Sequence, residues 1–260
     1  MIIGTIALLA LLFGGGTGEL FFVDQLEKGI KEFVIDKDRQ KDILSDLKTS
    51  KAFIMEYNKD REVDLKYFYD INASWYTTSE DLVMYFDKMQ KKRIAFQNTM
   101  ITNRIGIAEK ITFDEWVYIL QYSNISADKR IAKEQENTEK LEEKGKTPVV
   151  FENTRNAIKE NVPDEEKQSK ILDDLDDMIR TFGELGNEIS SMNVKGNNIL
   201  VRKDATKEEL KEMVEEMNVL RNLSFNQLLN FHMLVKENTS KTEWEPIMKA
   251  FNKELTITGK

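Results

Sequence analysis

The sequence carries one pattern twice, at a constant offset along the chain, and this repeat constrains the fold more than any other feature. The recurring residues include Thr78 and Thr206, Arg93 and Arg221, Glu115 and Glu243, and Trp116 and Trp244. Between positions 36 and 124, nineteen residues are identical to the residue at the equivalent position of the second copy, with no gap. This period is far longer than that of solenoid repeats, so we expect each copy to form a small folding unit.

Each copy has the periodicity of long amphipathic helices. No Gly or Pro interrupts residues 36–76, and apolar residues there recur near a seven-residue rhythm. Asp36 and Asp164 are expected N-caps, and Thr78 and Thr206 each begin a capping-box pattern. We predict an all-α fold: two tandem repeats of a long antiparallel helical hairpin plus a short helix, after an N-terminal apolar helix.

This pattern divides the chain into four segments. They are an apolar anchor or signal segment (1–23), a first helical repeat (24–126), a charged linker with a short helix (127–162) and a second helical repeat (163–260). Gly196 falls within the long first helix of the second repeat. Because a glycine in a helix interior costs up to about 1 kcal/mol, we expect that helix to bend or break near residues 196–198.

Composition and motifs argue against several functional classes. The net charge of −8, with both signs interspersed, is unlike that of a nucleic-acid-binding protein. The absence of cysteine excludes disulfides, thiolate metal sites and a cysteine nucleophile. His232, the only histidine, cannot by itself form a histidine metal site or a triad, and we expect it on a helix surface or partly packed. Phosphate loops, dinucleotide fingerprints, EF-hand loops and nucleophile elbows do not occur, so we expect no catalytic residue, metal or cofactor.

Residues 2–13 are apolar, and no ionisable side chain occurs before Glu19. As a helix, this stretch spans about 18 Å, whereas a bilayer core is about 30 Å thick. Three interpretations remain open: a short uncleaved anchor that extends towards Val23, a secretory signal segment, and a buried N-terminal helix. A signal peptide normally has basic residues before its apolar stretch, and their absence here argues against the secretory interpretation.

Arg93 and Arg221 each interrupt an otherwise apolar helix stripe. An arginine in such a position must reach solvent along its own stem or meet a carboxylate. Asp46 and Asp174, which are also equivalent in the two copies, lie beside the apolar face of the preceding helix. We therefore predict one Arg–Asp ion pair in each copy, with an arginine that extends to solvent as the alternative.

Trp116 and Trp244 follow the hairpins, and each is expected to cap one end of its hairpin core with its N–H at the rim. A pair of ligand-binding aromatics is the alternative. A long charged helix followed by Thr112-Phe113-Asp114-Glu115-Trp116 resembles the helical extracytoplasmic stress proteins with LTxxQ-type motifs, although the Leu-Thr and Gln of that motif are absent. The resemblance implies a helical protein of the cell envelope.

These features together favour a non-enzymatic, membrane-tethered or exported binding or scaffolding protein of a bacterial-type cell envelope. The expected partners are a membrane, through residues 1–23, and a protein or a second copy of the chain. One alternative is an envelope stress or chaperone-like protein that binds apolar segments between the two repeats. Another is a cytoplasmic helical protein.

Overall fold

The computed structural model describes residues 23–122 and 151–258, and every regular element in these two ranges is an α-helix. The helices are α2 (Val23–Phe33), α3 (Lys37–Ala73), α4 (Ser79–Lys110), a helix over 113–122, α6 (Glu152–Asn161), α7 (Glu165–Leu200), α8 (Lys207–Asn238) and α9 (Lys241–Thr258). The all-α prediction is confirmed for this part of the chain.

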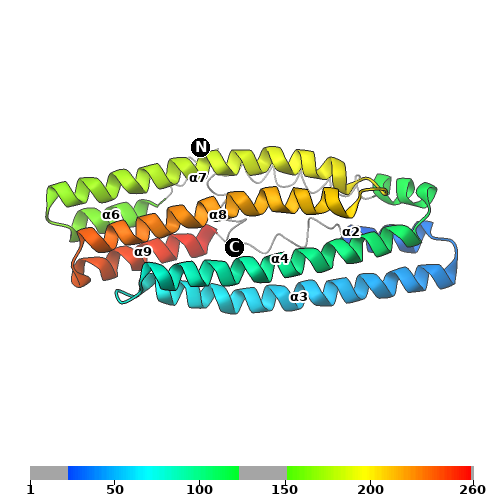
Figure 1. Ribbon diagram of the computed structural model, residues 1–260, viewed down its shortest axis with the longest axis horizontal. Helices are drawn as coiled ribbons and strands as arrows, with labels where there is room; N and C mark the ends of the chain where they lie inside the picture. Colours follow the sequence, from blue (N-terminus) through cyan, green and yellow to red (C-terminus); the bar gives the residue numbers. More distant parts are fainter. Residues whose placement is uncertain (1–22, 123–150, 259–260) are drawn as a thin grey trace, which may run out of the picture.

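Four long helices lie side by side along the long axis of the molecule (Figure 1). In what we call the N-terminal half (residues 23–122), α3 and α4 form a hairpin. In the C-terminal half (residues 151–258), α7 and α8 form another. α4 packs against α8 in the middle. The short helices α2 and 113–122 lie at one end of the molecule, and α6 and α9 lie at the other.

The helices begin where the sequence predicts caps. Asp36 accepts hydrogen bonds from the backbone N–H groups of the first turn of α3. Thr78 forms a capping box with Asp81 at the start of α4, and Thr206 forms the same box with Glu209 at the start of α8. Each cap satisfies N–H groups that have no partner within the helix and contributes about 1 kcal/mol.

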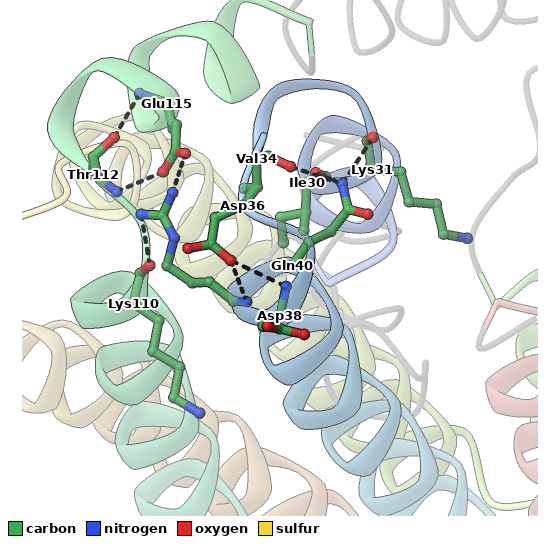
Figure 2. A network of polar contacts seen from close by, with 10 residues as sticks. Ile30, Lys31, Val34, Asp36, Asp38, Gln40, Lys110, Thr112 and Glu115 are labelled. Carbon is green, nitrogen blue, oxygen red and sulfur yellow. Dashed lines mark hydrogen bonds and ion pairs between the residues drawn. The ribbon is translucent and has the colours of Figure 1, made fainter.

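A polar network holds the corner between α2 and α3 (Figure 2). The side-chain amide of Gln40 donates to three carbonyl groups at the end of α2, those of Ile30, Lys31 and Val34. Arg39 donates to Glu115 at 2.5 Å and to the carbonyl oxygen of Lys110 at 3.5 Å. Three helices and the 113–122 segment are thereby joined at one corner. In the C-terminal half, Gln168 donates to the last carbonyls of α6 in the same way.

α7 is a continuous helix through Gly196 to Leu200, so the predicted break near residues 196–198 is wrong. Gly196 is buried, and a Cβ atom at this position would lie 3.0 Å from the sulfur of Met213 on α8. Helix packing thus compensates for the low helix propensity of glycine, because most helix stability in proteins comes from tertiary contacts.

α6 packs in the C-terminal half, although the sequence predicts a short helix that belongs to the linker (127–162). Phe151, Ile158 and Val162, in and beside α6, are buried in the core of that half. α6 packs on both α9 and α7. The apolar residues 1–22 and the charged residues 123–150 lie outside the described ranges. Within residues 23–122 and 151–258, no helix is both long and apolar enough to cross a bilayer.

The core consists of two clusters, and each cluster draws on both halves. The tip of the α3–α4 hairpin contributes Phe68, Leu82, Tyr85 and Met89 to the cluster built mainly by α6, α7, α8 and α9. The tip of the α7–α8 hairpin contributes Leu200, Leu210, Met213 and Val214 to the cluster at the opposite end. Each hairpin therefore completes the core of the other half.

Candidate functional site

The predicted Arg–Asp pairs do not form. Asp46 is paired with Lys110, at 2.7 Å, and no ion pair joins Arg93 or Arg221 to a carboxylate in the described residues. Burial, followed by nearby Asp177, raises the pKa of Asp174, whereas a paired arginine would lower it. The alternative of an arginine that reaches solvent is also wrong, because Arg93 is 6% exposed and Arg221 is 1% exposed.

The hairpin register explains why the predicted pairs are absent. In the antiparallel α3–α4 hairpin, Asp46 lies opposite Lys110, which ends α4. Arg93 lies almost five helical turns before Lys110, a separation of about 25 Å at a rise of about 1.5 Å per residue. The ring of Phe96 stacks on Tyr57, at 4.0 Å between centroids, so the α3 residues that lie near Arg93 come from the middle of that helix.

Arg93 and Arg221 instead both lie where α4 packs on α8. Arg93 contacts Phe225 of α8, and Arg221 donates to Asn218, which is bonded to Gln97 of α4. Burial, followed by the positive charge of Arg93, lowers the pKa of Arg221 to about 9. Burial also lowers the pKa of Arg93, and a hydrogen bond to the hydroxyl of Tyr57 partly offsets that effect. Both side chains remain cations at neutral pH, because arginine does not lose its proton there.

An amide pair lies beside the two arginines. Asn218 on α8 donates to the side-chain oxygen of Gln97 on α4 at 2.7 Å. The side-chain oxygen of Asn218 accepts from Gln97 at 3.4 Å and from Nη1 of Arg221 at 3.1 Å. We call Tyr57, Arg93, Gln97, Asn218 and Arg221 the central polar cluster. Gln97 and Asn218 were not predicted from the sequence, although each is a polar residue within an apolar helix stripe, and this signal could have identified them.

The guanidinium groups of Arg93 and Arg221 have more N–H donors than hydrogen-bond acceptors around them. The guanidinium of Arg93 lies 5.6 Å from the ring centre of Phe225, a cation–π distance. Nη1 of Arg93 and Nη2 of Arg221 are buried and have no hydrogen-bond partner among the described residues. An arginine has five N–H donors, so the central polar cluster has unused donor capacity for an anionic or carbonyl acceptor.

A cavity of about 270 Å³ opens between α3 and α4 next to this cluster. Its lining includes Tyr57, Arg61 and Phe96, and also the acids Glu56 and Asp60. Asp64 on its wall is an ion-pair partner of Lys92 and, at 3.4 Å, of Lys88. Tyr57 lines the cavity and also bonds to Arg93, so the cavity extends to the edge of the central polar cluster.

The two predicted hairpin-end aromatics lie at the ends of the opposite hairpins. Trp116 is 2% exposed and donates its indole N–H to the carbonyl oxygen of Val201, just after α7. Arg104 lies over the Trp116 ring, at 4.5 Å, and donates to the carbonyl oxygens of Leu200 and Arg202. Helix ends leave carbonyl groups without partners, and these side chains satisfy several of them.

At the equivalent site in the C-terminal half, which contains Trp244, a histidine stands in place of Arg104. Trp244 is fully buried and donates to the carbonyl oxygen of Ala73, the last residue of α3. His232, equivalent to Arg104, packs edge-on against Trp244, and its Nδ1 lies 2.9 Å from the side-chain oxygen of Asn72. Asn72 in turn donates to Asn252. The expectation that His232 lies on a surface or is partly packed is wrong, because its exposure is 0%.

Among residues 23–122 and 151–258, no group of three histidine, aspartate or glutamate side chains is arranged to hold a metal ion. Comparison with protein-family models, curated proteins and solved structures gives no match. The function is therefore argued from the residues of this chain alone.

Proposed function

We propose that this protein is a non-enzymatic, membrane-tethered or exported binding or scaffolding protein of a bacterial-type cell envelope. The observation that carries the proposal is the uneven distribution of exposed apolar side chains between the two halves. In the described ranges, the exposed large apolar residues of the N-terminal half are Ile35, Met55, Val63, Tyr67, Tyr76, Val83, Met84, Ile94, Phe113, Val117, Tyr118 and Tyr122. Those of the C-terminal half are Val219 and Leu223.

The repeat supplies an internal control for this distribution. Val83 and Met84 are replaced by Lys211 and Glu212 at the equivalent positions of the C-terminal half. Several other apolar residues have polar equivalents as well, such as Asp204 for Tyr76. Because polar residues occupy the equivalent positions in the C-terminal half, the fold does not require apolar residues there. Exposed apolar residues without a packing role favour an interaction surface.

The N-terminal half is also the half that the apolar segment enters, because α2 begins at Val23 directly after residues 1–22. A tether through residues 1–23 would hold the N-terminal half nearest the membrane. Its exposed tyrosines and phenylalanine suit a boundary between water and an apolar phase, where aromatic side chains are favoured.

We also infer that the chain arose by tandem duplication of a hairpin and a short helix. α4 and α8 both have 32 residues, and they start at equivalent positions of the repeat, Ser79 and Lys207. The caps at Thr78 and Thr206 and the reciprocal bonds of Trp116 and Trp244 support the same relationship. In this account each of two related halves packs its hairpin tip into the core of the other, and together they form a stiff body suited to a scaffold.

The chaperone-like alternative receives less support. It needs an open apolar surface between the two halves. In the described residues that space is occupied: the rings of Phe86 on α4 and Phe225 on α8 stack with their centres 4.4 Å apart. We therefore place the interaction surface on the outside of the N-terminal half.

Photo-crosslinking at matched positions tests the proposal. A photoreactive amino acid is introduced at Met84 or at Val83, and control variants carry it at Glu212 or Lys211, the equivalent positions. In cells that express the full-length chain, adducts are expected at Met84 and Val83 and should be several-fold weaker at the controls. Equal adducts at both sets, or none at Met84 and Val83, would contradict an interaction surface on the N-terminal half.

A further inference from the structure

Two buried cations lie where α4 packs on α8, and no carboxylate neutralises them in the described residues. Arg93 on α4 and Arg221 on α8 are 6% and 1% exposed. The positive charge of Arg61 on α3 lowers the pKa of both arginines, so three helices contribute positive charge to the same region. The cluster joins the two halves of the chain, because α4 belongs to one half and α8 to the other.

No carboxylate of a neighbouring element forms an ion pair with either arginine in the described residues. Glu56, Asp60 and Asp64 of α3 line the adjoining cavity, and Asp64 is engaged by Lys88 and Lys92 of α4. The charge of Glu62 raises the pKa of Arg61, but it is not among the causes that shift the pKa of Arg93 or Arg221. The groups that do contact Arg93 and Arg221 are a phenol, an amide and an aromatic ring, all of them uncharged.

A buried charge that lacks a counter-charge is costly, and natural proteins compensate it with a partner ion or a ligand. Cation–π contact and neutral hydrogen bonds recover part of that cost. They leave Nη1 of Arg93 and Nη2 of Arg221 without an acceptor. Guanidinium groups match the oxygens of carboxylates and phosphates, to which they donate two parallel hydrogen bonds.

We propose that Arg93 and Arg221 bind one small oxyanion, such as phosphate, at the junction of α4 and α8. The free N–H groups of the two guanidiniums donate to it, one from each half of the chain. The cavity between α3 and α4 gives the approach, because its wall includes Tyr57, which also contacts Arg93. The anion neutralises the central charge and links the two halves.

The test uses inorganic phosphate and the full-length chain in mild detergent. Titration calorimetry in a zwitterionic buffer without other multivalent anions is expected to show one phosphate bound per chain. Arg93→Met and Arg221→Met should each weaken binding by at least about tenfold, since a hydrogen bond to a charged group is worth about 1.5–3 kcal/mol. The methionine retains the apolar stem, and circular dichroism reports whether each variant is still helical.

Two control variants distinguish this site from general attraction to basic side chains. Arg104 is equally buried, but its guanidinium already donates to two carbonyl oxygens, so Arg104→Met should leave phosphate affinity within about twofold. Arg180 lies on the surface of α7 beside Asp177 and Glu184, and Arg180→Met should have no effect. Binding that survives in both Arg93→Met and Arg221→Met would overturn the proposal.

A second measurement covers the case in which the central variants fail to fold. Crystals of the unsubstituted chain are soaked in selenate, whose tetrahedral oxyanion resembles phosphate and scatters anomalously. The proposal predicts one anomalous peak between the guanidinium groups of Arg93 and Arg221. The absence of that peak, or peaks only at surface lysines, would show that the two arginines hold no oxyanion.

Discussion

Trp116 and Trp244, which occupy equivalent positions in the two copies of the repeat, each donate the indole N–H to the end of a long helix in the opposite half. Trp116 donates to the carbonyl oxygen of Val201 at 2.8 Å, and Trp244 donates to that of Ala73 at 3.0 Å. The two acceptors, Ala73 and Val201, are themselves equivalent positions of the repeat. The two bonds are therefore equivalent, and each half binds the connected tip of the other half's hairpin.

Replacing either tryptophan by phenylalanine should lower the free energy of unfolding by about 1–2 kcal/mol. The change removes one buried hydrogen bond and part of the ring volume, and it leaves a helix-end carbonyl without its partner. Urea unfolding monitored by circular dichroism measures the loss. Trp75→Phe is the control, because Trp75 is only partly buried, although it contacts Trp244 with ring centres 5.7 Å apart. A loss for Trp75→Phe as large as that for Trp244→Phe would contradict the role of the N–H bond.

Cutting the chain between the two halves should leave them bound to each other. Residues such as Phe68 and Leu82 of one hairpin tip are buried in the core of the C-terminal half, and Leu210 and Val214 are buried in the opposite core. A protease site inserted between residues 126 and 147 allows cleavage after folding. The two fragments are expected to co-elute in size-exclusion chromatography without denaturant. Fragments that separate and each remain helical would show that the halves are independent domains.

Replacing two helical glycines by alanine should have opposite effects on the stability of the fold. A Cβ atom at Gly29 of α2 would lie 2.9 Å from Cγ2 of Ile119 and 3.2 Å from its Cα atom, so the backbone would have to move. Gly29→Ala should therefore destabilise the protein by about 1–3 kcal/mol, although alanine is the better helix former. At Gly106 of α4 a Cβ atom meets nothing within 4 Å, so Gly106→Ala should stabilise it by about 0.5–1 kcal/mol. Thermal unfolding of both variants measures these changes, and a stabilising Gly29→Ala would contradict the packing of α2 on the 113–122 helix.

His232 makes stability depend on pH below neutrality. Burial, followed by the nearby charge of Lys236, lowers the pKa of His232 from 6.5 to about 4. Between these two values the unfolded chain binds the proton and the folded chain does not, so stability is complete above about pH 6.5 and is lost as pH falls towards 4. The free energy of unfolding should be about 2 kcal/mol lower at pH 5 than at pH 7.

His232→Gln separates this effect from the titration of acids. Glutamine can still donate to Asn72, but it does not titrate, and the chain has no other histidine. Urea unfolding at pH 5 and pH 7 should show most of the difference abolished in the variant. An unchanged difference would mean that carboxylates, and not His232, cause the pH dependence.

Local features of this fold could be predicted from the sequence, because they depend on neighbouring residues. The caps at Asp36, Thr78 and Thr206 determine where three long helices begin, and the structure has them there. The constant offset of the repeat likewise anticipates the matching lengths of α4 and α8. Capping signals act within one or two turns of a helix and need no knowledge of the tertiary arrangement.

The partners of the buried polar residues could not be predicted, because they depend on how the hairpins pack. The sequence identifies Arg93 and Arg221 as unusual, but only the crossing of α4 and α8 brings them together. The same holds for His232 of α8, which is buried and contacts Asn72 at the end of α3 and the Trp244 ring of α9. A repeat offset does not show whether the second hairpin extends the first or lies antiparallel beside it.

Membrane fractionation of the full-length chain, with N-terminal sequencing of the product, tests the proposed function most directly. The account predicts an intact N-terminus in a carbonate-washed membrane pellet, which identifies residues 1–23 as the tether, or an exported soluble chain that starts near Thr17, which identifies them as a cleaved signal. A soluble cytoplasmic chain that retains Met1 would contradict both the tether and the export, and with them the placement of this protein in the cell envelope.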